Sequence, residues 1–317
     1  MRAPRLGLLL ALVAAASLRA EEIAFGILGT DSAAALRQNW NPFLADMAKE
    51  TGLEVRGYFA TDYAGLVEAM RFGKVQLAWL GNKAAIEAVD RAEAEVFAQF
   101  VDLAGRSGYH AHLIVHRDSP IRTLDELLVR GRTLTLGIGD PQSTSGTLVP
   151  LAGVFAPRGL DPRTAFRVVR SSTHGGNLLA VLNRQLDAAT NNSEELDKLQ
   201  LADPAKFAQV RILWTSEPIP RDPLVWRRDL APAAKDRLRT FVLAYGKDDR
   251  EKAVLARMQQ IAGFRASDNR QLLPIRLLEF AQAAAKVTAD PHLSPDERAA
   301  RLAALDRRRA ALEATPR

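Results

Sequence analysis

Cysteine is absent from all 317 residues of the chain. Its absence excludes disulfide bonds, a catalytic thiol and a lipid anchor on an N-terminal cysteine. A lipid-tethered protein is therefore not expected, and any catalysis would have to use other nucleophiles.

Long apolar segments are also absent beyond the first 20 residues. The single run, residues 6–16, follows Arg2 and Arg5 and leads to a small residue, Ala20. This pattern predicts an export signal over residues 1–20, because so short a run does not span a bilayer. The alternative, an N-terminal membrane anchor, fits less well because a charged segment follows directly. We expect a soluble protein secreted into the periplasm.

Neither sign of charge dominates the sequence. There are 43 basic and 37 acidic residues, and three of the basic ones lie within the predicted signal. The arginines near the C-terminus alternate with acids along a predicted helix, which is typical of a solvated helix face. We therefore expect no nucleic-acid partner.

Short apolar runs alternate with amphipathic stretches along the chain. Strands are predicted at residues 23–28, 53–59, 77–80, 134–137, 166–169, 188–190 and 210–214, with helices between them. After residue 232 the sequence is largely helical. This alternation is typical of α/β units in which helices cover a mainly parallel sheet.

Two such α/β units followed by a helical return predict two lobes, with crossing connections near residues 115–119 and 215–221. The expected boundaries are a signal at 1–20, the first part of lobe 1 at 21–116, lobe 2 at 117–215, and at 216–317 a return to lobe 1 with C-terminal helices. A ligand is expected in the cleft between the lobes, beyond the carboxyl ends of the strands.

The strongest local motif is the segment 139–146, which follows a predicted strand and opens a helix. It places three hydroxyls, on Ser143, Thr144 and Ser145, beside backbone N–H groups that have no partner inside the helix. Such a helix start attracts oxyanions. Simple N-capping by one hydroxyl is the alternative. The segment is not a nucleotide-binding P-loop, because no lysine follows its final glycine.

Five further polar residues lie where cleft residues are expected. His174 lies between a strand and a helix, Glu194 follows a strand end, and Asp222 follows the second connection. Capping and turn formation are the alternatives for these three residues. Tyr63 and Tyr109 are candidates for the cleft or for ordinary core packing. The two acids together would suit an ammonium group.

A serine hydrolase is the alternative from another class of function. It would recruit Ser145, His174 and Asp187, a trio that any chain of this length contains. A metal site is not expected. The outer two of His110, His112 and His116 would lie about 20 Å apart on a strand, too far to share one ion.

The C-terminal residues 294–297 form a capping box with proline at the first helical position. The helix that follows carries a narrow stripe of Leu302, Leu305 and Leu312 among charges. The stripe can pack on its own lobe or on a second subunit, so a homodimer through this helix is left open.

These motifs resemble those of the periplasmic phosphonate-binding proteins of phosphonate ABC importers, the PhnD family. The matching stretches are residues 61–65, 72–82, 87–92, 139–150, 189–199, 222–226 and 264–276, spread over nearly the whole secreted chain. The resemblance implies a two-lobed periplasmic-binding fold of type II-like topology with a helical C-terminal extension. It also implies a binding protein rather than an enzyme, without cofactors and with an ABC permease as partner.

The resemblance also implies a role for each candidate residue. Ser143, Thr144, Ser145, Tyr63 and His174 would hold the phosphonate oxygens. Glu194 and Asp222 would hold the amine of an aminoalkyl phosphonate such as 2-aminoethylphosphonate, with Tyr109 lining the cavity beside them. His110 departs from the family pattern, which has an aromatic residue there, and affects ligand choice only if it touches the cavity. A phosphate or phosphite receptor is the alternative within the class.

Overall fold

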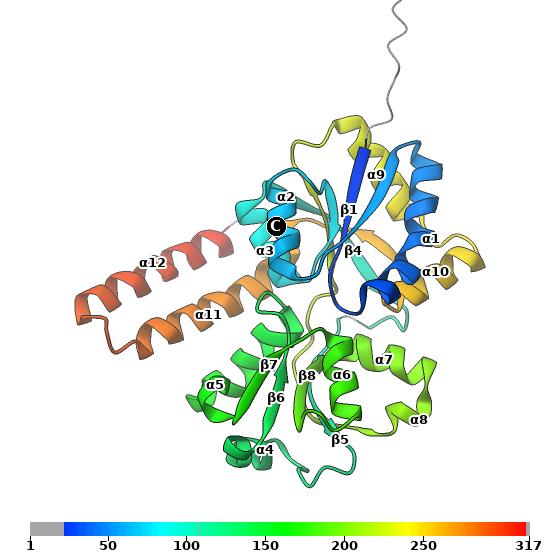
Figure 1. Ribbon diagram of the computed structural model, residues 1–317. Coiled ribbons are helices and arrows are strands. Elements are labelled where there is room, and N and C mark those ends of the chain that lie inside the picture. The colour runs from blue at the N-terminus through cyan, green and yellow to red at the C-terminus, as the bar shows by residue number, and fades with distance from the viewer. Residues whose placement is uncertain (1–21, 107, 315–317) are drawn as a thin grey trace, which may run out of the picture.

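The computed structural model describes residues 22–106 and 108–314, and it consists of two α/β lobes with a helical hairpin that projects from them (Figure 1). Lobe 1 is built on a six-stranded sheet in the order β11-β4-β10-β3-β1-β2. Its strands are β1 (Glu22–Ile27), β2 (Glu54–Phe59), β3 (Leu77–Trp79), β4 (Ala94–Asp102), β10 (Pro223–Arg227) and β11 (Ile261–Ala266). β1 runs parallel to β2 and β3, whereas β10 is antiparallel to β3 and β4.

Helices cover both faces of this sheet: α1 (Ala33–Thr51), α2 (Tyr63–Arg71), α3 (Asn82–Arg91), α9 (Pro232–Ala244) and α10 (Asp249–Gln259). α1 forms because Leu36, Trp40, Phe43 and Met47 recur at helical spacing, and all four are buried. Trp40 stacks on Trp79 of β3 with ring centroids 5.1 Å apart. The large aromatic side chains therefore pack α1 against the sheet of lobe 1.

Lobe 2 is built on a five-stranded sheet in the order β7-β6-β8-β5-β9. Its strands are β5 (Ala111–His116), β6 (Thr135–Ile138), β7 (Val168–Ser171), β8 (Ala188–Asn192) and β9 (Val210–Thr215). Its helices include α4 (Leu124–Arg130), α5 (Pro162–Ala165), α6 (His174–Leu182), α7 (Ser193–Ala202) and α8 (Pro204–Phe207). The predicted α/β fold of two sheets flanked by helices is confirmed.

The first connection between the lobes lies earlier than expected. β5 (Ala111–His116) was assigned to lobe 1, but it pairs with β8 and β9 in the second sheet. The connection therefore lies between the end of β4 at Asp102 and the start of β5 at Ala111, not at residues 115–119. The apolar pattern identifies a buried strand but not its partners, because pairing joins residues distant in sequence. The second connection, residues 216–222, overlaps the expected one.

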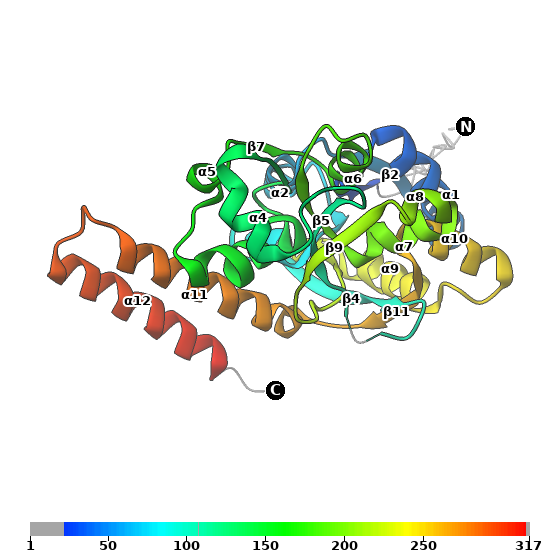
Figure 2. The same cartoon turned by 90° about the horizontal axis from the view of Figure 1, so that it is seen from below.

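The C-terminal helices α11 (Leu273–Ala289) and α12 (Pro295–Glu313) lie side by side as an antiparallel hairpin that extends from the lobes (Figures 1 and 2). The capping box is present, with Ser294 accepting from the backbone N–H of Glu297. Leu305 of α12 and Phe280 of α11 line one shared groove, and no residue of α12 is buried. The homodimer stays a prediction.

No helix in the described part of the chain is both long and apolar enough to cross a membrane. The export signal predicted over residues 1–20 lies outside the described residues.

Candidate functional site

The structure brings all eight candidate residues into one cavity between the lobes. They approach it from both lobes and from both connections, because strand ends of the two sheets face each other there. The lining consists of Tyr63, Tyr109, Ser143, Thr144, Ser145, His174, Glu194 and Asp222, together with Leu28, Thr30, Trp79, Gly81, Asn192, Glu195 and Gln259.

The hydroxyl cluster forms one end of this cavity. Ser143 accepts from the backbone N–H of Gly146 (3.0 Å) and so caps the helical segment that starts at Thr144. Thr144 accepts from the N–H of Lys83 in lobe 1 (2.9 Å), and Ser145 accepts from the amide of Asn192 (3.3 Å). Because each oxygen already accepts from the protein, each hydroxyl still has a proton to donate. Capping and anion binding are therefore compatible here.

Two tyrosines extend this set of donors. The Tyr63 side chain lies next to Ser143, and the Tyr109 side chain lies next to Ser145. Burial raises the pKa of both phenols, so both keep their protons. Tyr109 also lies next to Asp222, and so it stands between the hydroxyl end of the cavity and the acidic end.

His174 lies in the first turn of α6, next to the hydroxyl cluster. Its side chain is buried, and Nδ1 has no partner among the described residues. Burial, and next the nearby Lys198, lowers the pKa of His174 to about 4, so the ring is neutral near pH 7. A neutral imidazole still carries one N–H and can donate it to an oxyanion.

We expect folding stability to fall as the pH drops from about 6.5 to about 4. Burial lowers the pKa of both His174 and His112 to about 4 in the folded protein, from 6.5 when unfolded. In this window only the unfolded chain binds the two protons, and each histidine then costs up to about 3 kcal/mol. Thermal melting against pH tests this, with His112→Gln expected to flatten the slope and exposed His292→Gln as control. An equally steep slope in His112→Gln would contradict it.

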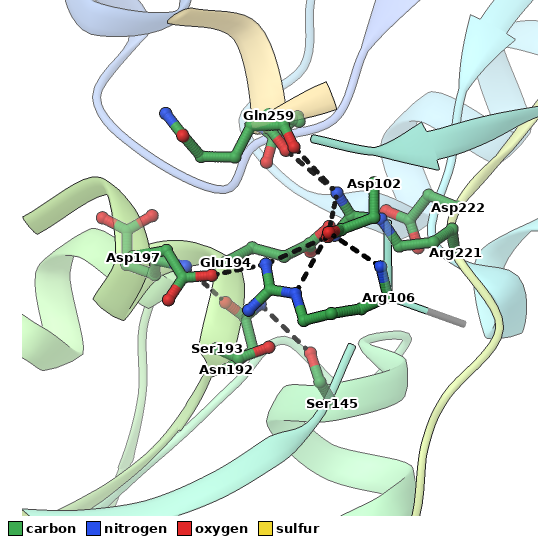
Figure 3. Close-up of polar contacts among 12 residues, drawn as sticks. Asp102, Arg106, Ser145, Asn192, Ser193, Glu194, Asp197, Arg221, Asp222 and Gln259 are labelled. Carbon is green, nitrogen blue, oxygen red and sulfur yellow. Dashed lines mark hydrogen bonds and ion pairs between the residues drawn. The ribbon is translucent and has the colours of Figure 1, made fainter. Parts of the chain in front are cut away.

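The acidic end of the cavity is formed by Asp222 and Glu194, and the two are not equivalent (Figure 3). Asp222 accepts from Trp79 Nε1 through Oδ2 (2.9 Å), while its buried Oδ1 has no partner among the described residues. Burial, and next the neighbouring Glu194, holds the pKa of Asp222 well above its usual range. Glu194 instead forms an ion pair with Arg221, which opposes the effect of burial on its pKa.

Three carboxylates line the cavity, and two cations, one buried and one half-buried, contact them. Arg221 pairs with Glu194, and Lys198 pairs with Glu195 at 2.5 Å. Asp222 is the remaining carboxylate of the three, and it has neutral partners only. A single ammonium group would complete the charge balance of this end.

Several residues that line the cavity or contact its lining were not found from the sequence. Thr30 follows the end of β1, so the rule that located the other candidates could have found it, and its buried Oγ1 has no partner among the described residues. In the sequence, Trp79 has only the pattern of a buried core residue, although its Nε1 donates to Asp222. Arg221 and Gln259 gave no signal, because their partners lie far away in the sequence.

The residues of the two other interpretations are not brought together. Asp187 binds the backbone N–H of Thr135 at 2.7 Å, at the start of β6 and so at the opposite sheet edge from Ser145. Among the described residues, no three histidines or acids stand close enough to hold a metal ion. His110 is not among the cavity-lining residues, and its Nδ1 faces the Ser216 carbonyl at 2.8 Å.

A cavity between two α/β lobes, with donors at one end and acids at the other, is the arrangement of a solute-binding protein. Residues 25–272 match a family described as "ABC transporter, phosphonate, periplasmic substrate-binding protein". The chain belongs to this family, as its sequence motifs indicated.

Known relatives agree with this assignment. The phosphonates-binding periplasmic protein of Escherichia coli K12 is 46% identical over 277 residues, 87% of this chain and 81% of the relative. The crystal structure of a binding protein of a Pseudomonas aeruginosa phosphonate ABC transporter superposes with a TM-score of 0.89 and 47% identity, covering 93% and 97% of the chains. A Mycolicibacterium smegmatis phosphate-import protein is 27% identical, covering 70% and 71%.

Proposed function

We propose that this protein binds an aminoalkyl phosphonate such as 2-aminoethylphosphonate between its lobes and delivers it to the permease of an ABC importer. The observation that carries the proposal is the carboxylate of Asp222. It is buried, one of its oxygens has no partner in the part of the chain that the structure describes, and it lies in the same cavity as the hydroxyl cluster. A ligand that is anionic at one end and cationic at the other satisfies both ends of this cavity.

The phosphonate group belongs at the hydroxyl cluster. Ser143, Thr144 and Ser145 offer oriented protons at a helix start, and hydrogen bonds to a charged group are stronger than neutral ones. Tyr63 adds a donor from lobe 1, and neutral His174 adds one from lobe 2. Hydrogen-bond donors would surround the phosphonate oxygens, and Tyr109 would separate these oxygens from the carboxylate of Asp222.

The ammonium group belongs at the acidic end, between Asp222 and Glu194. Without a cation, a buried carboxylate with a free oxygen is costly, and two neighbouring carboxylates repel each other. The ammonium removes both costs, and it donates to Asp222 Oδ1 and to the Glu194 oxygen that does not contact Arg221. The Trp79 N–H orients Asp222 for this contact.

The lobes are in contact around the cavity. Tyr63 N–H donates to Asp140 (3.2 Å), and Gly175 N–H donates to the Thr30 carbonyl (3.3 Å). A ligand held by Tyr63 on one side and Thr144 on the other contacts both lobes, so its binding favours the closed arrangement. Closure on the ligand would present the joined lobes to the permease.

A phosphate or phosphite receptor is the second candidate, and the phosphate-import relative is the observation in its favour. Phosphate would occupy the hydroxyl cluster and leave Asp222 without a cation. The unmatched carboxylate therefore favours an amine-bearing ligand over a simple anion.

Titration calorimetry of the secreted protein distinguishes these candidates. We expect 2-aminoethylphosphonate to bind at least about 10²-fold more tightly than phosphate or methylphosphonate, because only the amine pairs the buried acids. Tight phosphate binding with no response to phosphonates would favour the second candidate. Equal affinity for the two phosphonates would show that the acids have a structural role only.

We also propose that residues 1–20 direct export and are removed. Arg2, Arg5, the apolar run and Ala20 support this. N-terminal sequencing of the protein from the periplasmic fraction is expected to begin near Glu21, and recovery of uncleaved chain from the cytosol would contradict it.

A further inference from the structure

Arg221, in the second connection, is anchored to lobe 1 by both its backbone and its side chain. Its carbonyl accepts from the amides of Gln99 (3.0 Å) and Gln271 (3.3 Å). Its Nη2 contacts Asp102 Oδ2 (3.1 Å) and the carbonyl of Gln260 (3.2 Å). These partners all belong to lobe 1 or its edge, so the guanidinium keeps its place whether or not lobe 2 is near.

The other end of the guanidinium reaches across to lobe 2. Nη1 donates to Oε1 of Glu194, at the start of α7, and Figure 3 shows the side chains of Arg221, Glu194 and Asp102 close together. Both side chains of this pair are almost fully buried, with 3% of Arg221 and 6% of Glu194 exposed. Closure of the lobes therefore pairs Glu194 with a cation of the protein itself, and this pairing does not depend on which ligand is bound.

The Arg221–Glu194 pair lowers the free-energy cost of enclosing a ligand that has no amine. If Glu194 had no protein partner, enclosing such a ligand would bury two unpaired carboxylates, Glu194 and Asp222. Breaking a buried ion pair by removing one partner is strongly unfavourable, because it leaves an uncompensated charge. With Arg221 present, Glu194 is already compensated, and only Asp222 lacks a cation. Asp222 can be buried in its neutral form, because its pKa is raised.

We propose that Arg221 is a specificity-determining residue that widens the range of phosphonates this receptor accepts. It supplies Glu194 with a counter-charge, so that phosphonates without an amine can also be enclosed. This inference rests on the proposed function, in that it takes the acidic end of the cavity as the place of the ligand amine. The two acids then have different roles. Asp222 favours ligands with an amine, and the pairing of Glu194 with Arg221 limits the loss of affinity for ligands without one.

The test is calorimetry with 2-aminoethylphosphonate and methylphosphonate on the wild type and on Arg221→Gln. We expect Arg221→Gln to weaken methylphosphonate by about 10²-fold or more, because Glu194 is then buried unpaired. The amine-bearing ligand should lose about 10-fold or less, because its ammonium replaces the guanidinium. The ratio of the affinity for 2-aminoethylphosphonate to the affinity for methylphosphonate should therefore increase. A merely structural Arg221 would weaken both ligands by the same factor.

Further variants complete the experiment. In Glu194→Gln/Arg221→Gln the side chain at position 194 no longer carries a charge that needs a counter-charge, and methylphosphonate affinity should return to within about 10-fold of the wild type. Arg228→Gln is the matched control, since Arg228 is an exposed arginine of lobe 1 whose contact with Glu93 is 3.6 Å long. It should change neither affinity. Should Arg221→Gln not fold, Arg221→Lys keeps the charge, and its ligand preference should match that of the wild type.

The outcomes separate this inference from the proposed function. If the wild type binds both phosphonates equally and Glu194→Gln changes neither affinity, the amine role itself fails. If the wild type prefers the amine but Arg221→Gln weakens both ligands equally, the proposed function stands and this inference is overturned. Two other results overturn it as well. One is a double variant whose affinity for methylphosphonate is as low as that of Arg221→Gln. The other is an Arg221→Lys variant whose preference for the amine-bearing ligand exceeds that of the wild type.

Discussion

Asp222→Asn is expected to weaken 2-aminoethylphosphonate by about 10²- to 10³-fold, the range for losing one partner of a buried charge pair. The carboxylate loses the charge that faces the ammonium, while the amide keeps its size and can still accept from Trp79 Nε1. Methylphosphonate should bind within a few-fold of the wild type. The asparagine resembles the protonated aspartate, the form that burial and Glu194 favour when no cation is present.

Calorimetry on the two phosphonates measures this effect, with Asp229→Asn as the control. Asp229 is an exposed acid of lobe 1 that pairs with Arg227 outside the cavity, so its neutralisation should change neither affinity. The raised pKa of Asp222 adds a second signature. Binding of the amine should release a proton, visible as a heat that depends on the ionisation enthalpy of the buffer, and Asp222→Asn should abolish it. Equal weakening of both ligands would contradict an amine contact at Asp222.

Removing the hydroxyls is expected to weaken all ligands together. Thr144→Ala and Ser145→Ala each delete one donor to a charged group, at about 1.5–3 kcal/mol each. The double variant should therefore lose about 10²- to 10⁴-fold in affinity for 2-aminoethylphosphonate and for methylphosphonate alike. This uniform loss is the opposite of the selective loss at Asp222, because both ligands carry the same phosphonate group.

Ser143→Ala is kept as a separate variant because Ser143 also caps a helix. Loss of an N-cap hydroxyl typically costs about 1 kcal/mol of stability, which melting would register. Ser32→Ala is the matched control, since Ser32 caps α1 outside the cavity by accepting from the N–H of Ala35 (3.2 Å). It should lower stability without changing affinity. Unchanged phosphonate binding in the double variant and in Ser143→Ala would show that the cluster only caps.

Local pattern was sufficient for most helices and strands, although β4, β10 and β11 were not predicted, and for the edge of the sheets where the site lies. Helical spacing of Leu36, Trp40 and Phe43 identifies α1, because a buried helix face needs apolar residues at that spacing wherever the helix packs. The hydroxyls of segment 139–146 and the acid Glu194 were found because they follow strand ends. In open α/β sheets those ends share one edge.

Only the tertiary structure decided which distant groups meet. The sequence could not place β5 in lobe 2, because its apolar residues would be buried equally well in either sheet. It could not show that Arg221 compensates Glu194, since their contact joins the second connection to α7 across the cleft. Burial and charge pairing depend on what surrounds a side chain in space. The sequence therefore identified eight of the residues that line the cleft, and the fold decided that Asp222, not Glu194, is left for a ligand cation.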